Sequence, residues 1–363
     1  MRVSPSQLVP GCILLRDVNG KTNRPIIPKN TELTEKHITV LHKFLVEHVD
    51  VSNLLNNGAP FKPDSIDEKT ESPESESTTI NFLQLPFKEH YLYVVNEYKK
   101  LFKSWRNKKT IESLAVRNLI LPLLDRMDEI GSEVYTLHQY ANKKDYFYHH
   151  SVSVSVLSAY LGKKMGYQKG EWLQIGLAGL LSDVGMVKLG DFAFNKEGVL
   201  TNEEKLEIRN HPTYSYRMVE HISSIPYAVK LAVLQHHERK DGSGYPLGLS
   251  QDKIHGFARI IAVCDMYHAM TSDRIYREKQ SPFKVIEELQ KDQFSKLDPR
   301  VVQVFVDAIA NFSIGTKVVL SNDQVGEIVF IDQKQPTRPI VRLDNGEIIT
   351  LSNHHNLHIK EIV

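Results

Sequence analysis

Between about residues 80 and 312, apolar residues recur at helical spacing almost throughout, and this pattern restricts the fold more than any other feature of the chain. The clearest stripes lie within 119–127, 154–161 and 172–181. Residues three and four positions apart share one face of an α-helix, so each stripe marks a helix with a buried side. We therefore expect a mainly α protein built around a helical bundle at 80–312.

Near residue 313 the apolar period changes from 3.6 to about 2. Short runs at 318–320, 327–331, 340–343 and 348–351 read as β-strands, and turn-forming residues such as Asp344-Asn345-Gly346 separate them. Several short strands at this spacing are typical of a small barrel. We expect residues 313–363 to form a small C-terminal β-barrel.

The first 79 residues fall into two parts. Residues 1–56 mix short strand-like runs with one helix, which Thr34 would cap and whose apolar face holds Ile38 and Leu41. Residues 57–79 consist mostly of Asn, Pro, Ser, Glu, Lys and Asp, a composition that cannot offset the entropy lost on ordering. We expect a small α/β N-terminal domain at 1–56 and a flexible linker at 57–79.

Bulk properties exclude several classes of protein. The formal net charge is only +1, so no global field would attract a nucleic acid polymer. No apolar run approaches the roughly 20 residues that cross a bilayer, and the first residues lead into no signal-peptide core. Cys12 and Cys264 have no disulfide or zinc-knuckle spacing. We expect a cytoplasmic protein without membrane insertion, and a homodimer or a signalling-protein partner stays open.

The segment with the most chemical content begins at residue 236. Adjacent histidines, His236 and His237, precede Glu238 and then the loop Gly242-Ser243-Gly244-Tyr245-Pro246. Imidazole is the commonest side-chain metal ligand, and glycine permits the close approach of backbone to a ligand. The segment predicts a metal site with a lip that faces a substrate.

Six residues near the ends of helical stripes could converge on metal: His150, Asp183, His211, His236, His237 and Asp265. Imidazoles with two carboxylates suit Fe, Mn or Zn better than Mg or Ca. Two ions bridged by an aspartate would acidify a water and clamp both oxygens of a phosphoryl displacement. The alternative is ordinary, because a single histidine is more often a capping or surface residue than a ligand. We expect seven others to be solvated: His37, His42, His48, His90, His354, His355 and His358.

Residues 145–280 resemble the HD-GYP domains, the metal-dependent phosphohydrolases of the HD superfamily that break down bacterial cyclic di-GMP. The matching segments, in the order of the family, are 148–151, 180–185, 196–204, 210–212, 236–246, 258–265 and 272–277. The resemblance implies an HD-superfamily helical bundle and two divalent ions, Fe or Mn, held by the six residues with Asp183 bridging. Residues 1–56 resemble, more weakly, a small domain often found before such modules.

The resemblance also implies the substrate contacts. Gly244, Tyr245 and Pro246 would hold one guanine-phosphate half of cyclic di-GMP. Arg274 and Arg277 fall where the family places basic phosphate contacts, for which the planar guanidinium is suited. The alternatives are a solvated helix-start face for the arginines and a core position for Tyr245.

Four positions depart from the family pattern. The name-giving His-Asp pair reads Ser182-Asp183, and Met186 stands where a lysine near the scissile phosphate is expected. Tyr146 replaces the glutamate of members with three metals, and His268 replaces an acidic or amide residue. Lys188 is near enough in sequence to substitute for the missing lysine, so we assign it, with Asp183, a catalytic role.

Three functions follow from this pattern. The first is a phosphodiesterase that opens cyclic di-GMP to pGpG or GMP and is slowed by Ser182 and Met186. The second is a catalytically inactive receptor for cyclic di-GMP or a partner domain. The third is a scaffold that keeps a structural metal. The retained phosphate-handling residues favour the first.

Overall fold

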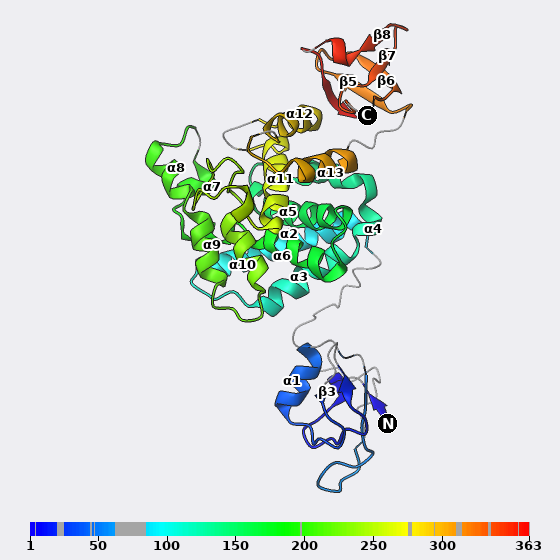
Figure 1. Ribbon diagram of the computed structural model, residues 1–363, viewed down its shortest axis with the longest axis vertical. Helices are drawn as coiled ribbons and strands as arrows, with labels where there is room; N and C mark the ends of the chain where they lie inside the picture. The colour runs from blue at the N-terminus through cyan, green and yellow to red at the C-terminus, as the bar shows by residue number, and fades with distance from the viewer. Residues whose placement is uncertain are drawn as a thin grey trace, which may run out of the picture. The chain divides into compact units, whose positions relative to one another are not determined.

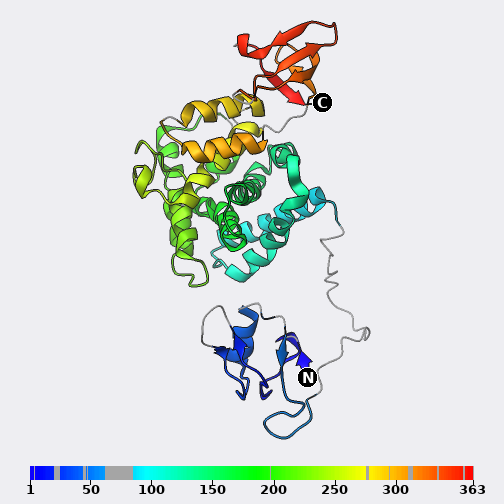
Figure 2. The ribbon, with the colours of Figure 1, turned by 45° about the vertical axis from the view of Figure 1, so that its right-hand side comes forward.

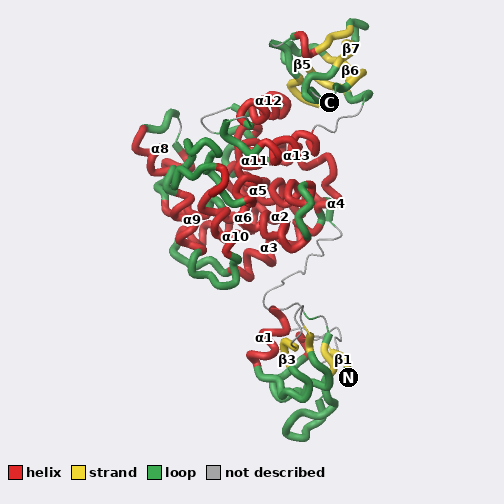
Figure 3. Tube along the Cα trace, in the orientation of Figure 1, coloured by secondary structure: helices red, strands yellow, loops and turns green. Residues whose placement is uncertain are grey.

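The structure, a computed structural model, describes residues 1–3, 5–19, 25–43, 46, 48–61, 85–196, 198–274, 278–293, 295–309, 314–332, 335–354 and 356–362. The chain divides into two compact units, Met1–Thr79 and Ile80–Val363. Helices dominate the second unit as far as residue 309, and strands occur in the N-terminal unit and near the C-terminus (Figure 3). No helix among the described residues has both the length and the apolar character needed to cross a bilayer.

The N-terminal unit has its own small core. β1 (Arg2–Val3) pairs with β4 (Val49–Asp50), and β2 (Val18–Asn19) pairs with β3 (Pro25–Ile27). One helix, α1 (Glu35–Lys43), begins directly after Thr34, whose hydroxyl accepts a hydrogen bond from the backbone N–H of His37. Phe61 packs in this core, so the ordered unit extends past residue 56. The predicted linker beyond residue 61 lies outside the described residues.

The helical region begins with α2 (Phe87–Arg106), which packs against α3 and α5. The remaining helices are α3 (Ser113–Asp125), α4 (Met127–Ile130), α5 (Tyr146–Lys164), α6 (Lys169–Leu181), α7 (Phe192–Asn195), α8 (Asn202–Ile208), α9 (His211–Val219), α10 (Tyr227–Gln235), α11 (Gly256–Thr271), α12 (Pro282–Asp292) and α13 (Pro299–Ile309). Two 3₁₀ segments matter below, η3 (Gly131–Tyr140) and η4 (Val184–Lys188). Figure 1 shows α5 in the middle of this region. The three apolar stripes of the sequence lie in α3, α5 and α6, so the expected bundle is confirmed.

Helix α5 is buried on all sides. Every residue from His149 to Gly162 is buried, and α2, α6, α11 and α13 pack around it. Glycines allow α6 to approach it closely, since a Cβ on Gly179 would lie 3.0 Å from Val154 O and 3.1 Å from Ser155 Cα. The Ser155 hydroxyl donates to Gly176 O at 2.7 Å. The glycines thus let the two backbones meet, and the Ser155 hydroxyl finds its acceptor on the neighbouring helix.

The C-terminal segment forms a five-stranded antiparallel sheet. Its order is β8 (Ile348–Thr350), β7 (Ile340–Leu343), β6 (Val325–Phe330), β5 (Lys317–Leu320) and β9 (Ile359–Ile362). Four of these strands were expected, and β9 was not. The barrel stays a prediction, because β8 and β9 stand at the two ends of the ladder. The sheet lies beside α12 (Figures 1 and 2), and Phe283 of α12 belongs to its core.

The expectation that His90 is solvated was wrong. His90 lies on the inner face of α2 with 1% of its surface exposed. Its Nδ1 is 3.3 Å from the guanidinium of Arg126, which also binds Glu129. Burial, followed by the charge of Arg126, lowers the pKa of His90 to about 4. The histidine therefore packs as a neutral core residue.

The close approach of α5 and α6 predicts a stability effect. Gly179→Val places a branched side chain against the α5 backbone and should lower the free energy of unfolding by about 1–3 kcal/mol, the usual cost of overpacking. Gly170→Val is the matched control in the same helix, because a Cβ there meets nothing within 4 Å. Thermal unfolding followed by circular dichroism measures both, and equal stability of the two variants would contradict the packing argument.

Candidate metal centre

Helix α5 presents His150 to two carboxylates. His150 Nε2 lies 2.9 Å from Asp265 Oδ1 and 3.5 Å from Asp183 Oδ2. Asp265 comes from the middle of α11, and Asp183 lies in the turn between α6 and η4. Its neighbour His149 faces the other way, toward Tyr91 of α2. Only the second histidine of the His149-His150 pair therefore reaches the cluster.

Asp183 is brought to His211 by close packing at the start of α9. A Cβ on Gly185 would lie 2.3 Å from His211 O and 2.4 Å from Ser215 N, so only glycine fits there. The Gly185 N–H donates to Ser215 Oγ, which in turn donates to Ser182 O. This contact leaves Asp183 Oδ1 3.0 Å from His211 Nε2. Asp183 and His211, brought together by the fit of Gly185 against α9, thus form one side of the site.

Two imidazoles are oriented by the backbone. Nδ1 of His211 lies 2.7 Å from Ile208 O, and Nδ1 of His236 lies 2.8 Å from Val233 O. A carbonyl oxygen only accepts, so both Nδ1 atoms carry hydrogen and both Nε2 lone pairs turn toward Asp183. These Nε2 atoms are 3.2 Å apart. Two lone pairs at this distance beside a carboxylate require a positive charge, which is either a proton or a metal ion.

The sixth residue, His237, connects the cluster to the Gly-Tyr-Pro loop. Its Nδ1 is 3.8 Å from Asp265 Oδ2, and its ring stacks on Tyr245 with centroids 4.7 Å apart. The guanidinium of Arg209 lies 4.7 Å from the centroid of the same tyrosine ring. Tyr245 therefore stands at the edge of the cluster, and its role in holding substrate stays a prediction.

Glu238 holds this lip in place. Its carboxylate is buried and accepts hydrogen bonds from Leu247 N at 2.6 Å and Leu249 N at 2.9 Å. Gly244 fits against the same segment, since a Cβ there would lie 2.3 Å from Arg239 N. Sequence reasoning noted Glu238 only as a carboxylate beside two histidines. Its distance of nine residues from Leu247 gave no signal of this structural role.

The ionisation of the cluster suits metal binding. Burial alone would raise the pKa of Asp183. In the state where a proton rather than a metal ion supplies the positive charge, hydrogen bonds from His211 and His236 hold that pKa well below its ordinary value. Burial is also the largest influence on Asp265 and raises its pKa, but the hydrogen bond with His150 and the charges of His237 and His150 together lower that pKa below its ordinary value. Burial lowers the pKa of His237 well below its ordinary value, and His236 lowers it further. Ionised carboxylates and neutral imidazoles are the forms that bind metal.

The six residues form two overlapping groups of ligand atoms. Asp183, His211, His236 and His237 make one group, and His150, Asp183 and Asp265 make the other, with the atoms of each within 4.8 Å of one another. Asp183 belongs to both groups, which is the arrangement expected of a carboxylate that bridges two ions. The donor set of imidazoles and carboxylates fits divalent transition metals, and the clusters indicate metal binding typical of HD domains.

Ser182 does not contribute a ligand in this arrangement. Its hydroxyl is buried and donates to Ala178 O one turn back in α6, at 2.8 Å. Met186 lies in η4 with its side chain packed partly against the core. Residue 182 therefore gives the cluster no donor, and residue 186 gives it no amine.

Neutral and cationic groups surround His150 on its other side. Nδ1 of His150 is 3.1 Å from His268 Nδ1 and 3.2 Å from the Tyr146 hydroxyl. Arg274 lies over the Tyr146 ring at 4.8 Å and donates to Ala269 O. Sequence reasoning treated Tyr146 and His268 only as losses. Tyr146 precedes His150 by one helical turn, a spacing that could have predicted this contact.

Two remaining candidates are less constrained by the structure. Lys188 ends η4 with an exposed side chain, and its catalytic role stays a prediction. Arg277 lies outside the described residues.

Comparison with known proteins agrees with this geometry. Residues 137–301 match the family described as HD domain. The cyclic di-GMP phosphodiesterase PA4108 of Pseudomonas aeruginosa is 34% identical over 212 residues, which cover 56% of this chain and 51% of that protein. The cyclic di-GMP phosphodiesterase PdeB of Borreliella burgdorferi is 30% identical over 202 residues, which cover 55% and 53% respectively. The chain therefore aligns with about half the length of each relative.

The fold also matches a solved structure. The protein Bd1817, titled a HDG"Y"P protein from Bdellovibrio bacteriovorus, superposes with a TM-score of 0.50 at 15% identity, covering 85% of this chain and 98% of that one. The similarity extends beyond the HD segment and supports the fold of the chain as described. Residues 137–301 therefore match an HD domain, and with its two ligand groups and its Gly-Tyr-Pro lip this part of the chain is similar to HD-domain cyclic di-GMP phosphodiesterases.

Proposed function

We propose that the protein is a cytoplasmic, metal-dependent phosphodiesterase that hydrolyses cyclic di-GMP to pGpG or GMP. The observation that carries the proposal is the membership of Asp183 in both ligand groups, beside the lip at 244–246. Two divalent ions, Fe or Mn, are assigned to the six residues His150, Asp183, His211, His236, His237 and Asp265. Such a pair, when bound, would supply positive charge to a phosphoryl transition state and lower the pKa of an attacking water.

The protein's own residues are assigned the binding and positioning of substrate. Gly244, Tyr245 and Pro246 would receive one guanine-phosphate half, with Glu238 keeping that loop rigid. Arg274 and Arg277 are assigned to phosphate oxygens. Arg209 brings another guanidinium to the lip, through its position over Tyr245. Bidentate guanidinium contacts would orient the two phosphates relative to the carboxylates.

The second candidate function is a receptor that binds cyclic di-GMP without hydrolysing it. One observation favours it: the Ser182 hydroxyl is used by the helix backbone, and Met186 provides no amine. A site that keeps its lip but lacks these two groups could bind a cyclic dinucleotide and turn it over slowly or not at all. The two functions differ in chemistry, whereas both require the same ligand groups.

The bridging role of Asp183 predicts unequal effects of two matched substitutions. Asp183→Asn affects both ligand groups and should leave well under one bound ion per chain, whereas Asp265→Asn affects one group and should leave about one, against about two in the parent. Metal analysis after loading with Mn or Fe measures the three proteins. Two retained ions in Asp183→Asn, or equal loss in both variants, would contradict a shared aspartate.

The phosphodiesterase proposal predicts that the metal-loaded parent converts cyclic di-GMP to a linear product. Ser182→His combined with Met186→Lys should raise turnover by about tenfold or more, the scale on which metal-site changes act. Ser182→Ala is the control, because it removes the hydroxyl without adding a ligand. Nucleotide binding without turnover in the parent would favour the receptor, and neither binding nor turnover would exclude both functions.

The role assigned to Lys188 gives a separate prediction. Lys188→Ala should reduce turnover by about tenfold or more, within the range for loss of a group that assists proton transfer or phosphate binding. Lys240, whose backbone N–H binds Lys296 O near the lip, provides the control Lys240→Ala. Steady-state turnover of cyclic di-GMP compares the two, and equal loss in both variants would remove the support for Lys188.

A further inference from the structure

A cavity of about 900 Å³ lies between the helical region and the C-terminal sheet. Its walls come from η3, from the start of α12 and from β9, so it is separate from the ligand groups of the metal centre. The volume is within the usual range for small-molecule sites, which is about 300–1,000 Å³. The junction is held together by a buried phenylalanine, Phe283, and by the bidentate pair Arg338–Glu287.

The cavity is lined by more positive than negative charge. The lining residues include one carboxylate, Glu361, and three lysines, Lys279, Lys284 and Lys360. Lys360 is already paired with Asp323 at 2.7 Å. Within the described ranges no carboxylate forms an ion pair with Lys279 or Lys284, so these two charges are not neutralised by the protein. A concave site concentrates the electric field of such charges, and the concentrated field attracts anions.

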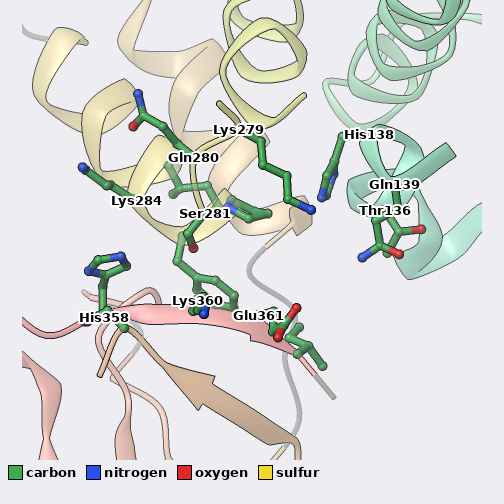
Figure 4. A pocket seen from close by; sticks show the side chains of 15 residues that line it. Thr136, His138, Gln139, Lys279, Gln280, Ser281, Lys284, His358, Lys360 and Glu361 are labelled. Carbon is green, nitrogen blue, oxygen red and sulfur yellow. The ribbon is translucent and has the colours of Figure 1, made fainter. Parts of the chain in front are cut away.

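The positive groups lie at two ends of the cavity. Figure 4 shows Lys279 extending toward His138 on one side of Ser281, while Lys284 and His358 lie on the other side. Burial lowers the pKa of His358, and the charge of Lys284 lowers it further, so this imidazole is a neutral hydrogen-bonding group at pH 7. An elongated ligand with more than one anionic group would meet both ends.

We propose that this cavity binds a phosphorylated small molecule of nucleotide to dinucleotide size, with Lys279 and Lys284 as its phosphate contacts. Lysine acts on phosphate as a point charge, and the polar side chains of Thr136, Gln139 and Gln280 offer hydrogen bonds to the rest of the ligand. The site is distinct from the proposed substrate site, and its occupancy requires no hydrolysis.

The test measures binding of fluorescent mant-ATP to the full-length, metal-loaded protein, with inorganic pyrophosphate as competitor. We expect saturable binding in the micromolar range and a loss of at least about tenfold in Lys279→Glu/Lys284→Glu, because each lost charge-assisted contact costs roughly a factor of ten. The control Lys291→Glu/Lys317→Glu makes the same change of charge at exposed residues outside the cavity. It should change the affinity by less than about twofold, as screened surface charges do.

Two further proteins keep the outcome interpretable. Lys279→Gln/Lys284→Gln removes the charge without inverting it and should lose affinity less severely, with an unchanged melting temperature as evidence of folding. Asp183→Asn should retain saturable mant-ATP binding, which separates this site from the metal centre. Absence of saturable binding, equal binding by the Lys279/Lys284 and Lys291/Lys317 variants, or loss of binding in Asp183→Asn would overturn the proposal.

Discussion

The structure depends on two carboxylates that lie, largely shielded from solvent, among imidazoles inside a helical bundle. Asp183 comes from the turn after α6 and Asp265 from α11, and both meet His150. Isolated charges in such an environment are costly, so they are kept only where positive charge and hydrogen bonds compensate them. Backbone carbonyls orient His211 and His236 so that their rings lie beside Asp183 and can help to compensate its charge. A divalent cation completes this arrangement better than a proton, because it satisfies several lone pairs at once.

Close backbone packing brings the ligands within reach of one another. Gly185 lets η4 contact the first turn of α9, and Gly179 lets α6 contact α5. A side chain at either glycine would separate the elements that carry Asp183, His211 and His150. The metal centre is therefore specified as much by residues without side chains as by the ligands themselves.

The helices and four of the five C-terminal strands could be predicted from the periodicity of apolar residues. The stripes at 119–127, 154–161 and 172–181 indicated the helices, and the alternating runs after residue 313 indicated four strands. β9 was missed because Ile359–Ile362 offers only two apolar residues, and its pairing with β5 is set by tertiary contact. The buried position of His90 was missed for a similar reason, since its partner Arg126 is 36 residues away. Local patterns carry no record of such long-range partners.

Side-chain direction was also beyond the sequence. The sequence shows directly that residue 182 is a serine, which is a weak metal ligand, but it does not show the hydroxyl bond to Ala178 O. The groups around His150 show the same limit: the sequence contains Tyr146 and His268, and only the structure shows that both approach the same nitrogen. Tyr146 and His268 are neutral partners of His150, so the negative charge of the centre comes from Asp183 and Asp265.

Helix α11 connects this centre with the C-terminal cavity. It carries Asp265 in its middle, and Gln280 on the cavity wall donates its backbone N–H to Met270 O near the end of the same helix at 2.9 Å. A ligand that orders the segment around Lys279 and Gln280 would therefore act on the helix that positions a metal-binding carboxylate. Coupling of this kind needs two states that both sites bias, and α11 is one element through which such a bias would pass.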